Sequence, residues 1–106
     1  MVDAERLVNR FLQLVQIDSE TKQERQICDV LHHLLQKMGL EVMEDDSAQE
    51  TGHGAGNLIA CLKGKAPHLP SLLFTAHMDT VAPGRGVKPQ IREGYVVSDG
   101  STILGS

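Results

Sequence analysis

The chain has 106 residues, a length that fits a single domain, and hydrophobic residues make up 41% of it. Its net charge of -4 and its 3% of aromatic residues exclude the basic surfaces and base-stacking platforms of nucleic-acid-binding proteins. The sequence contains no run near the roughly 20 apolar residues that cross a membrane. Its acidic start, Met1 to Glu5, lacks the basic and apolar regions of a secretory signal. We therefore expect a soluble, cytoplasmic protein that binds neither nucleic acid nor membrane.

Two amphipathic helices are predicted within the first forty residues. Asp3 is the expected N-cap of the first helix, and apolar residues recur at helical spacing until the chain breaks at residues 16–19. Thr21 and Glu24 have the spacing of a capping box at the start of the second helix. Gly39 is expected to supply its left-handed C-terminal cap.

Strands are predicted at residues 40–43, 58–62 and 72–76, with a polar, Gly-rich loop at 44–56. The last two runs are apolar without alternation, which is typical of strands covered on both faces in a mostly parallel sheet. Further on, a tight hairpin is expected around Glu93–Gly94. Together with the helices, this pattern predicts an α/β domain with a C-terminal hairpin.

Cys28 and Cys61 fall inside separate apolar patterns, and neither belongs to a CxxC motif. We expect both to be buried free thiols in a reducing compartment.

The most informative residues are His77 and Asp79, which end the apolar run "SLLFTA". Ligands of open α/β sheets bind at the carboxyl ends of strands, and residues i and i+2 of an extended chain point to the same side. An aspartate that accepts one ring N–H of a histidine leaves the other nitrogen free to bind a metal. The pair could also transfer protons, or His77 could merely cap the strand end.

Other polar residues have simpler interpretations. Asp99 is expected to form a turn rather than to bind a ligand. Arg85 is predicted to lie in a surface turn, with recognition of a substrate carboxylate as the alternative. His53 has no metal-ligand spacing. His32 and His33 are expected at the rim or in solvent, and His68 is expected to be an ordinary residue of the connector before the third strand.

Three segments resemble a known enzyme family: "FLQLVQIDSETKQE", "FTAHMDTVAPG" and "GYVVSDGSTILGS". They are similar to the N-terminal part of the zinc-dependent exopeptidases that include peptidase T, the tripeptide aminopeptidase. The resemblance implies that His77 binds one of two zinc ions and that Asp79 orients His77. It also implies a short peptide substrate and metal-assisted amide hydrolysis. Residues 1–106 would then form an incomplete three-layer-type catalytic domain, with two N-terminal helices, a mostly parallel mixed sheet and a C-terminal hairpin.

The resemblance further implies that the metal-bridging aspartate would follow Ser106, with the general base, the other ligands and a dimerisation domain beyond it. We therefore expect a truncated chain that is inactive by itself and that self-associates, as a homo-oligomer, through its unpaired sheet edges. Two alternatives stay open for its function. One is a related zinc-dependent deacylase or carboxypeptidase, and the other is a non-enzymatic α/β binding module.

Overall fold

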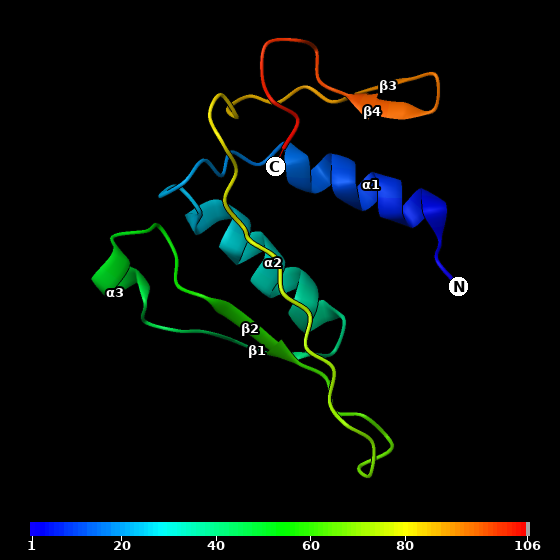
Figure 1. Ribbon diagram of the computed structural model, residues 1–106, viewed down its shortest axis with the longest axis vertical. Coiled ribbons are helices and arrows are strands. Elements are labelled where there is room, and N and C mark those ends of the chain that lie inside the picture. The colour runs from blue at the N-terminus through cyan, green and yellow to red at the C-terminus, as the bar shows by residue number, and fades with distance from the viewer. Residues whose placement is uncertain (106) are drawn as a thin grey trace.

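The computed structural model describes residues 1–105, so Ser106, the last residue of "GYVVSDGSTILGS", lies outside the described part. Figure 1 shows α2 packed on a small two-stranded sheet, while α1 and a separate hairpin near the C-terminus lie apart from that sheet. The elements in chain order are α1 (Ala4–Val15), α2 (Arg25–Lys37), β1 (Glu41–Glu44), α3 (Ala48–Thr51), β2 (Leu58–Cys61), β3 (Gln90–Arg92) and β4 (Tyr95–Val97).

The two predicted helices are present, but only the first begins as expected. Asp3 caps α1 by accepting a hydrogen bond of 2.9 Å from the Arg6 backbone N–H. The capping box predicted for α2 is wrong, because Glu24 makes no side-chain cap bond and Thr21 bonds elsewhere. At the other end of α2, Gly39 adopts the predicted left-handed conformation, with φ of 88°.

Both sheets are antiparallel pairs. β1 pairs with β2, with Glu41 opposite Cys61, and β3 pairs with β4 across the turn at Glu93–Gly94. Positive φ angles at both turn residues are those of a type I′ turn, so the predicted C-terminal hairpin is confirmed. The prediction of a mostly parallel sheet is wrong: within residues 1–105 the parallel pairing is one isolated bridge, Glu20 to Thr80.

The apolar run before His77 does not form the predicted strand. Residues 71–79 run past α2 without strand pairing, and the side chains of Leu72, Leu73 and Phe74 are more than 80% exposed. A strand needs a neighbour to satisfy its backbone groups, and no strand in residues 1–105 pairs with this segment. The expectation that the apolar runs are covered on both faces is therefore also wrong.

The described core is small, and its residues come from α2, from the loop before β2 and from the segment before β3. Its buried apolar residues are Ile27, Cys28, Ala55 and Val87. Cys28 is a buried free thiol, as predicted, whereas Cys61 is free but exposed at the end of β2. The loop at 44–56 also differs from prediction, because it contains the short helix α3. Within residues 1–105, no helix combines the length and the apolar composition that a membrane crossing requires.

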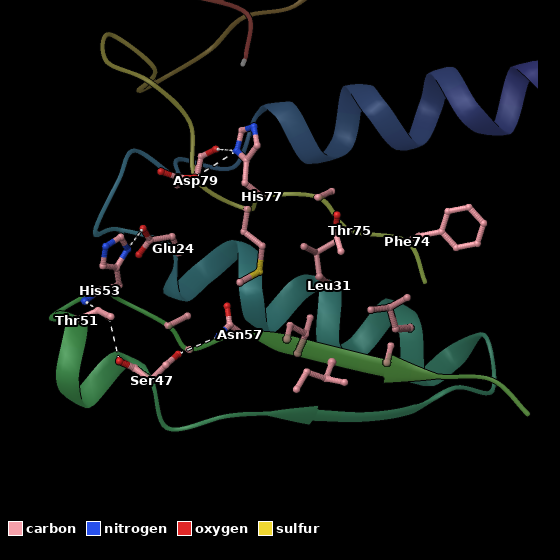
Figure 2. Close-up of a pocket in the computed structure, with 18 of the residues that line it drawn as sticks. Glu24, Leu31, Ser47, Thr51, His53, Asn57, Phe74, Thr75, His77 and Asp79 are labelled. Carbon is pink, nitrogen blue, oxygen red and sulfur yellow. Dashed lines mark hydrogen bonds and ion pairs between the residues drawn. The ribbon is translucent and has the colours of Figure 1, made fainter. Parts of the chain in front are cut away.

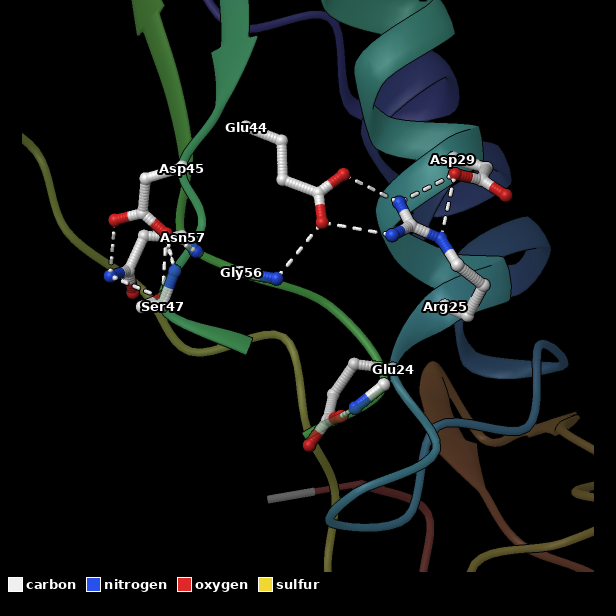
Figure 3. Close-up of polar contacts among 9 residues, drawn as sticks. Glu24, Arg25, Asp29, Glu44, Asp45, Ser47, Gly56 and Asn57 are labelled. Carbon is white, nitrogen blue, oxygen red and sulfur yellow. Dashed lines mark hydrogen bonds and ion pairs between the residues drawn. The ribbon is translucent and has the colours of Figure 1, made fainter. Parts of the chain in front are cut away.

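An ion pair joins α2 to the end of β1 (Figure 3). The Arg25 guanidinium donates to both carboxylate oxygens of Glu44, at 2.8 and 2.7 Å, and also pairs with Asp29. The Gly56 N–H adds a third bond to Glu44 at 2.9 Å. The bonds from Arg25, and then that from Gly56, lower the pKa of Glu44 from 4.5 to about 2.

This pKa predicts how acid destabilises the fold. A carboxylate with a lowered pKa stabilises the native state above its unfolded pKa of 4.5, and this contribution is lost as the pH falls towards 2. Thermal melts of the chain should therefore show a falling Tm over this range. Glu44→Gln should flatten that fall. Glu41→Gln should not, because Glu41, on the same strand as Glu44, has only an exposed 3.9 Å contact with Lys63. If Tm fell equally with pH in the wild type, Glu44→Gln and Glu41→Gln, the lowered pKa of Glu44 would not be the cause.

Candidate functional site

A cleft of about 650 Å³ separates β2 from the segment that carries His77. Leu31 and Leu35 of α2 line this cleft, together with residues 57–60 on β2 and 73–79 on the segment that carries His77 (Figure 2). The loop that carries α3 contributes Ser47, Thr51 and His53 to the same cleft. The cleft is therefore mostly apolar along its length, with polar groups concentrated at the end nearest His77 and His53.

The structure brings His77 and Asp79 together, as the sequence predicts. His77 Nδ1 lies 2.7 Å from the Asp79 carbonyl oxygen and 3.2 Å from Asp79 Oδ1. Figure 2 shows the two side chains on the same side of the segment, directed towards one another. Both partners of Nδ1 are acceptors, so Nδ1 carries the ring proton and donates. In the neutral ring, Nε2 is left with a free lone pair on a side chain that is 59% exposed.

A second histidine–carboxylate pair lies at the same cleft, and the sequence did not indicate it. His53 Nδ1 is 2.9 Å from Glu24 Oε1, and the Glu24 side chain is only 5% exposed. Glu24 also accepts hydrogen bonds from the backbone N–H groups of Lys22 and Gly54, at 2.6 and 2.9 Å. Burial by itself raises the pKa of Glu24, but the bonds from Lys22 and Gly54 outweigh it and lower the pKa below 4.5.

The other candidate residues have local roles. Asp99 forms the predicted turn, accepting bonds from the N–H and hydroxyl of Ser101, and the bond from the hydroxyl is the main cause of its lowered pKa. Arg85 lies in a turn as predicted. Its side chain is held by an ion pair, because its Nε donates a hydrogen bond to Glu20 at 2.9 Å. His68 is exposed in the connector before residue 71.

The donor chemistry at His77 fits one corner of a metal site. A histidine held through Nδ1 by a carboxylate and a carbonyl presents Nε2 in the form that zinc binds. Residues 1–105 bring together no group of three or more His, Cys, Asp or Glu side chains that could hold a metal ion. A catalytic zinc commonly has three protein ligands, so further ligands would have to come from outside these residues.

No protein-family model matches the chain. It is 56% identical, over all 106 of its residues, to 28% of the uncharacterized protein YqjE of Bacillus subtilis. Among solved structures, it matches the aminopeptidase PepT of Bacillus cereus, with a TM-score of 0.95 and 56% identity. It also matches a tripeptidase of Staphylococcus aureus, with a TM-score of 0.93 and 45% identity. Each structural match covers 98% of this chain and 28% of the other.

These matches confirm the resemblance that the His77 motif indicated. The chain spans just over a quarter of the length of the relatives it matches. Over nearly its whole length, the chain is similar in sequence and in fold to a segment of the peptidase T-like aminopeptidases and tripeptidases.

Proposed function

We propose that the chain is the N-terminal portion of the catalytic domain of a binuclear zinc aminopeptidase, which removes the N-terminal residue from short peptides. The observation that supports this most is the match at 56% identity to an aminopeptidase, in a fold that presents His77 Nε2 free beside a cleft. The names of the matched structures, aminopeptidase and tripeptidase, favour this activity over a deacylase or carboxypeptidase. We also propose that the protein acts in the cytoplasm.

The residues of the chain would contribute binding and orientation. The backbone carbonyl of Asp79 accepts the Nδ1–H of His77, with Oδ1 of the carboxylate nearby, and so keeps Nε2 available as one ligand of the metal pair. When bound, the zinc pair would supply Lewis acidity and an activated water for amide hydrolysis. The cleft beside His77 is open and polar at that end, which suits the backbone groups of a short peptide. By itself the chain would be inactive, because it would lack the remaining ligands and the general base.

A hybrid enzyme tests the proposal. The matching segment of the Bacillus cereus aminopeptidase PepT is replaced with this chain, and release of the N-terminal residue from a tripeptide is measured. We expect activity on a tripeptide with a free amino terminus and none when that amine is acetylated. A folded, zinc-loaded hybrid that cleaves only acetylated substrates would favour the deacylase alternative. A folded hybrid that cleaves neither would count against the proposal.

The chain alone is expected to bind zinc weakly. Calorimetric titration of the 106-residue chain should give weak binding or none, because His77 would be a single ligand. Tight binding that is lost in His77→Ala, but kept in His68→Ala, would show that further ligands come from this chain or from a second copy. That result would overturn the view that the chain holds one corner of the site.

We further propose that the isolated chain self-associates through its exposed apolar segment. Leu72, Leu73 and Phe74 are 82, 87 and 88% exposed and follow one another on an unpaired, extended backbone. Such a patch on an open edge favours association between copies. Light scattering should give a mass above that of the monomer, and Leu73→Ser with Phe74→Ser should lower it. A concentration-independent monomer would contradict this.

A further inference from the structure

The loop between α1 and α2 is fastened to the segment that follows His77. Each of its residues 18–21 bonds to a residue in the range 79–86, which lies about sixty positions further along the chain. The backbone and side-chain bonds are Thr80 N–H to Ser19 O (2.8 Å), Thr21 N–H to Thr80 O (3.2 Å), Gly84 N–H to Glu20 Oε1 (2.9 Å) and Gly86 N–H to Asp18 Oδ1 (2.8 Å).

One further bond between the two segments joins Thr21 to Asp79. Its hydroxyl Oγ1 donates to Asp79 Oδ2 at 2.7 Å, while the other oxygen, Oδ1, lies 3.2 Å from His77 Nδ1. The two oxygens of one carboxylate are therefore divided between Thr21 and His77. Because the Thr21 backbone N–H is itself bonded to Thr80, the hydroxyl is held at a fixed distance from the carboxylate.

A carboxylate in this position needs such a restraint. The Asp79 side chain is 35% exposed, so without a second bond its terminal torsion is free to turn Oδ1 away from the histidine and into water. The bond from Thr21 selects the rotamer in which Oδ1 faces Nδ1. A charge-assisted bond of this length is stronger than one between neutral groups.

We propose that Thr21 is a positioning residue: by holding Asp79 Oδ2, it fixes the carboxylate so that Oδ1 adds to the Asp79 carbonyl as a second acceptor and favours the Nδ1–H tautomer of the His77 ring. The catalytic meaning of this arrangement rests on the proposed function, but the arrangement itself does not. The apparent capping-box threonine thus serves the histidine 56 positions away rather than the helix that follows it.

The tautomer of His77 can be read in the 106-residue chain without metal or substrate. Nitrogen-15 NMR spectra of the histidine rings are recorded at about pH 8.5, where an ordinary imidazole with a pKa of roughly 6.5 is neutral. We expect His77 to be in the Nδ1–H form. Thr21→Val, which keeps the shape of the side chain but removes the donor, should raise the fraction of the Nε2–H form. The shift should be partial, because the Asp79 carbonyl still accepts from Nδ1 at 2.7 Å. Thr21→Ser should restore the Nδ1–H form.

Three further variants decide what the shift means. Thr80→Val removes the hydroxyl that faces Ser19 at 3.4 Å in the same pair of segments, without touching Asp79, and should leave the tautomer unchanged. Asp79→Asn should shift it at least as much as Thr21→Val, and Thr21→Ala serves if the valine variant does not fold. An unchanged ring in Thr21→Val and Thr21→Ala, or an equal shift in Thr80→Val, would overturn the proposal. Because no activity is measured, an inactive hybrid enzyme would refute the proposed function and leave this result standing.

Discussion

His77→Ala should abolish tripeptide hydrolysis by the hybrid enzyme described above. The substitution removes Nε2, the ligand atom that this chain would contribute, and leaves the Asp79 carbonyl oxygen without the ring N–H that it accepts. Losing a group that only orients a ligand typically costs 10- to 100-fold in affinity or activity, so losing the ligand itself should cost more than ~100-fold. The measurement is kcat/KM for a tripeptide, together with the zinc content of the purified protein.

Matched variants separate this effect from a loss of folding. His68→Ala removes an exposed histidine from the connector and should leave kcat/KM unchanged. Asp79→Asn keeps the side-chain shape and should lower kcat/KM by about 10- to 100-fold. If His77→Ala retains both its zinc and its activity, His77 is not a metal ligand.

Glu24→Ala should destabilise the fold, because the Glu24 side chain is a nearly buried acceptor. It would leave three donors without their partner: the backbone N–H groups of Lys22 and Gly54, and the ring of His53. An unpaired buried donor costs about 1–3 kcal/mol, and these three donors are only partly buried, so the free energy of unfolding should fall by about 1–3 kcal/mol in total. Urea denaturation followed by circular dichroism measures the change.

Two glutamate variants provide the comparison. Glu24→Gln keeps one acceptor oxygen in nearly the same volume, so its loss of stability should lie between those of wild type and Glu24→Ala. Glu50→Ala removes an exposed carboxylate from α3 and should change stability by less than about 0.5 kcal/mol. A Glu24→Ala protein as stable as Glu50→Ala would show that the buried carboxylate does not hold the loop to α2.

The parts of the fold that could be predicted from the sequence are those with local signals. The Asp3 cap, the left-handed Gly39 and the Glu93–Gly94 turn each depend on a few adjacent residues, and each has the predicted conformation. The direction of the sheet and the strand at 72–76 depend instead on which neighbours are available. An apolar run indicates that a segment can be buried. It does not indicate whether the strand that would pair with it lies within the same 105 residues.

The same distinction applies to the candidate site. His77 and Asp79 are two positions apart, and the side chains of residues i and i+2 of an extended backbone point to the same side even without a paired strand, so their proximity follows from the sequence. The Glu24–His53 and Thr21–Asp79 contacts join residues 29 and 58 positions apart, and no local pattern indicates either one. Thr21 and Glu24 also matched a capping box, and this local interpretation concealed their actual partners.

The fastening of residues 18–21 to 79–86 also sets an order of events in folding. α2, β1 and β2 occupy one stretch of fewer than forty residues, so their contacts close short loops, whereas the bonds around Asp79 close loops of 58 to 68 residues. Longer loops cost more entropy to close, and contacts of high sequence separation form slowly. In pulse-labelling hydrogen exchange, the amides of α2 and β2 should therefore become protected before those of Thr21 and Thr80. The environment of His77 would be assembled last, and a newly made chain would acquire a competent metal ligand only after its local scaffold is complete.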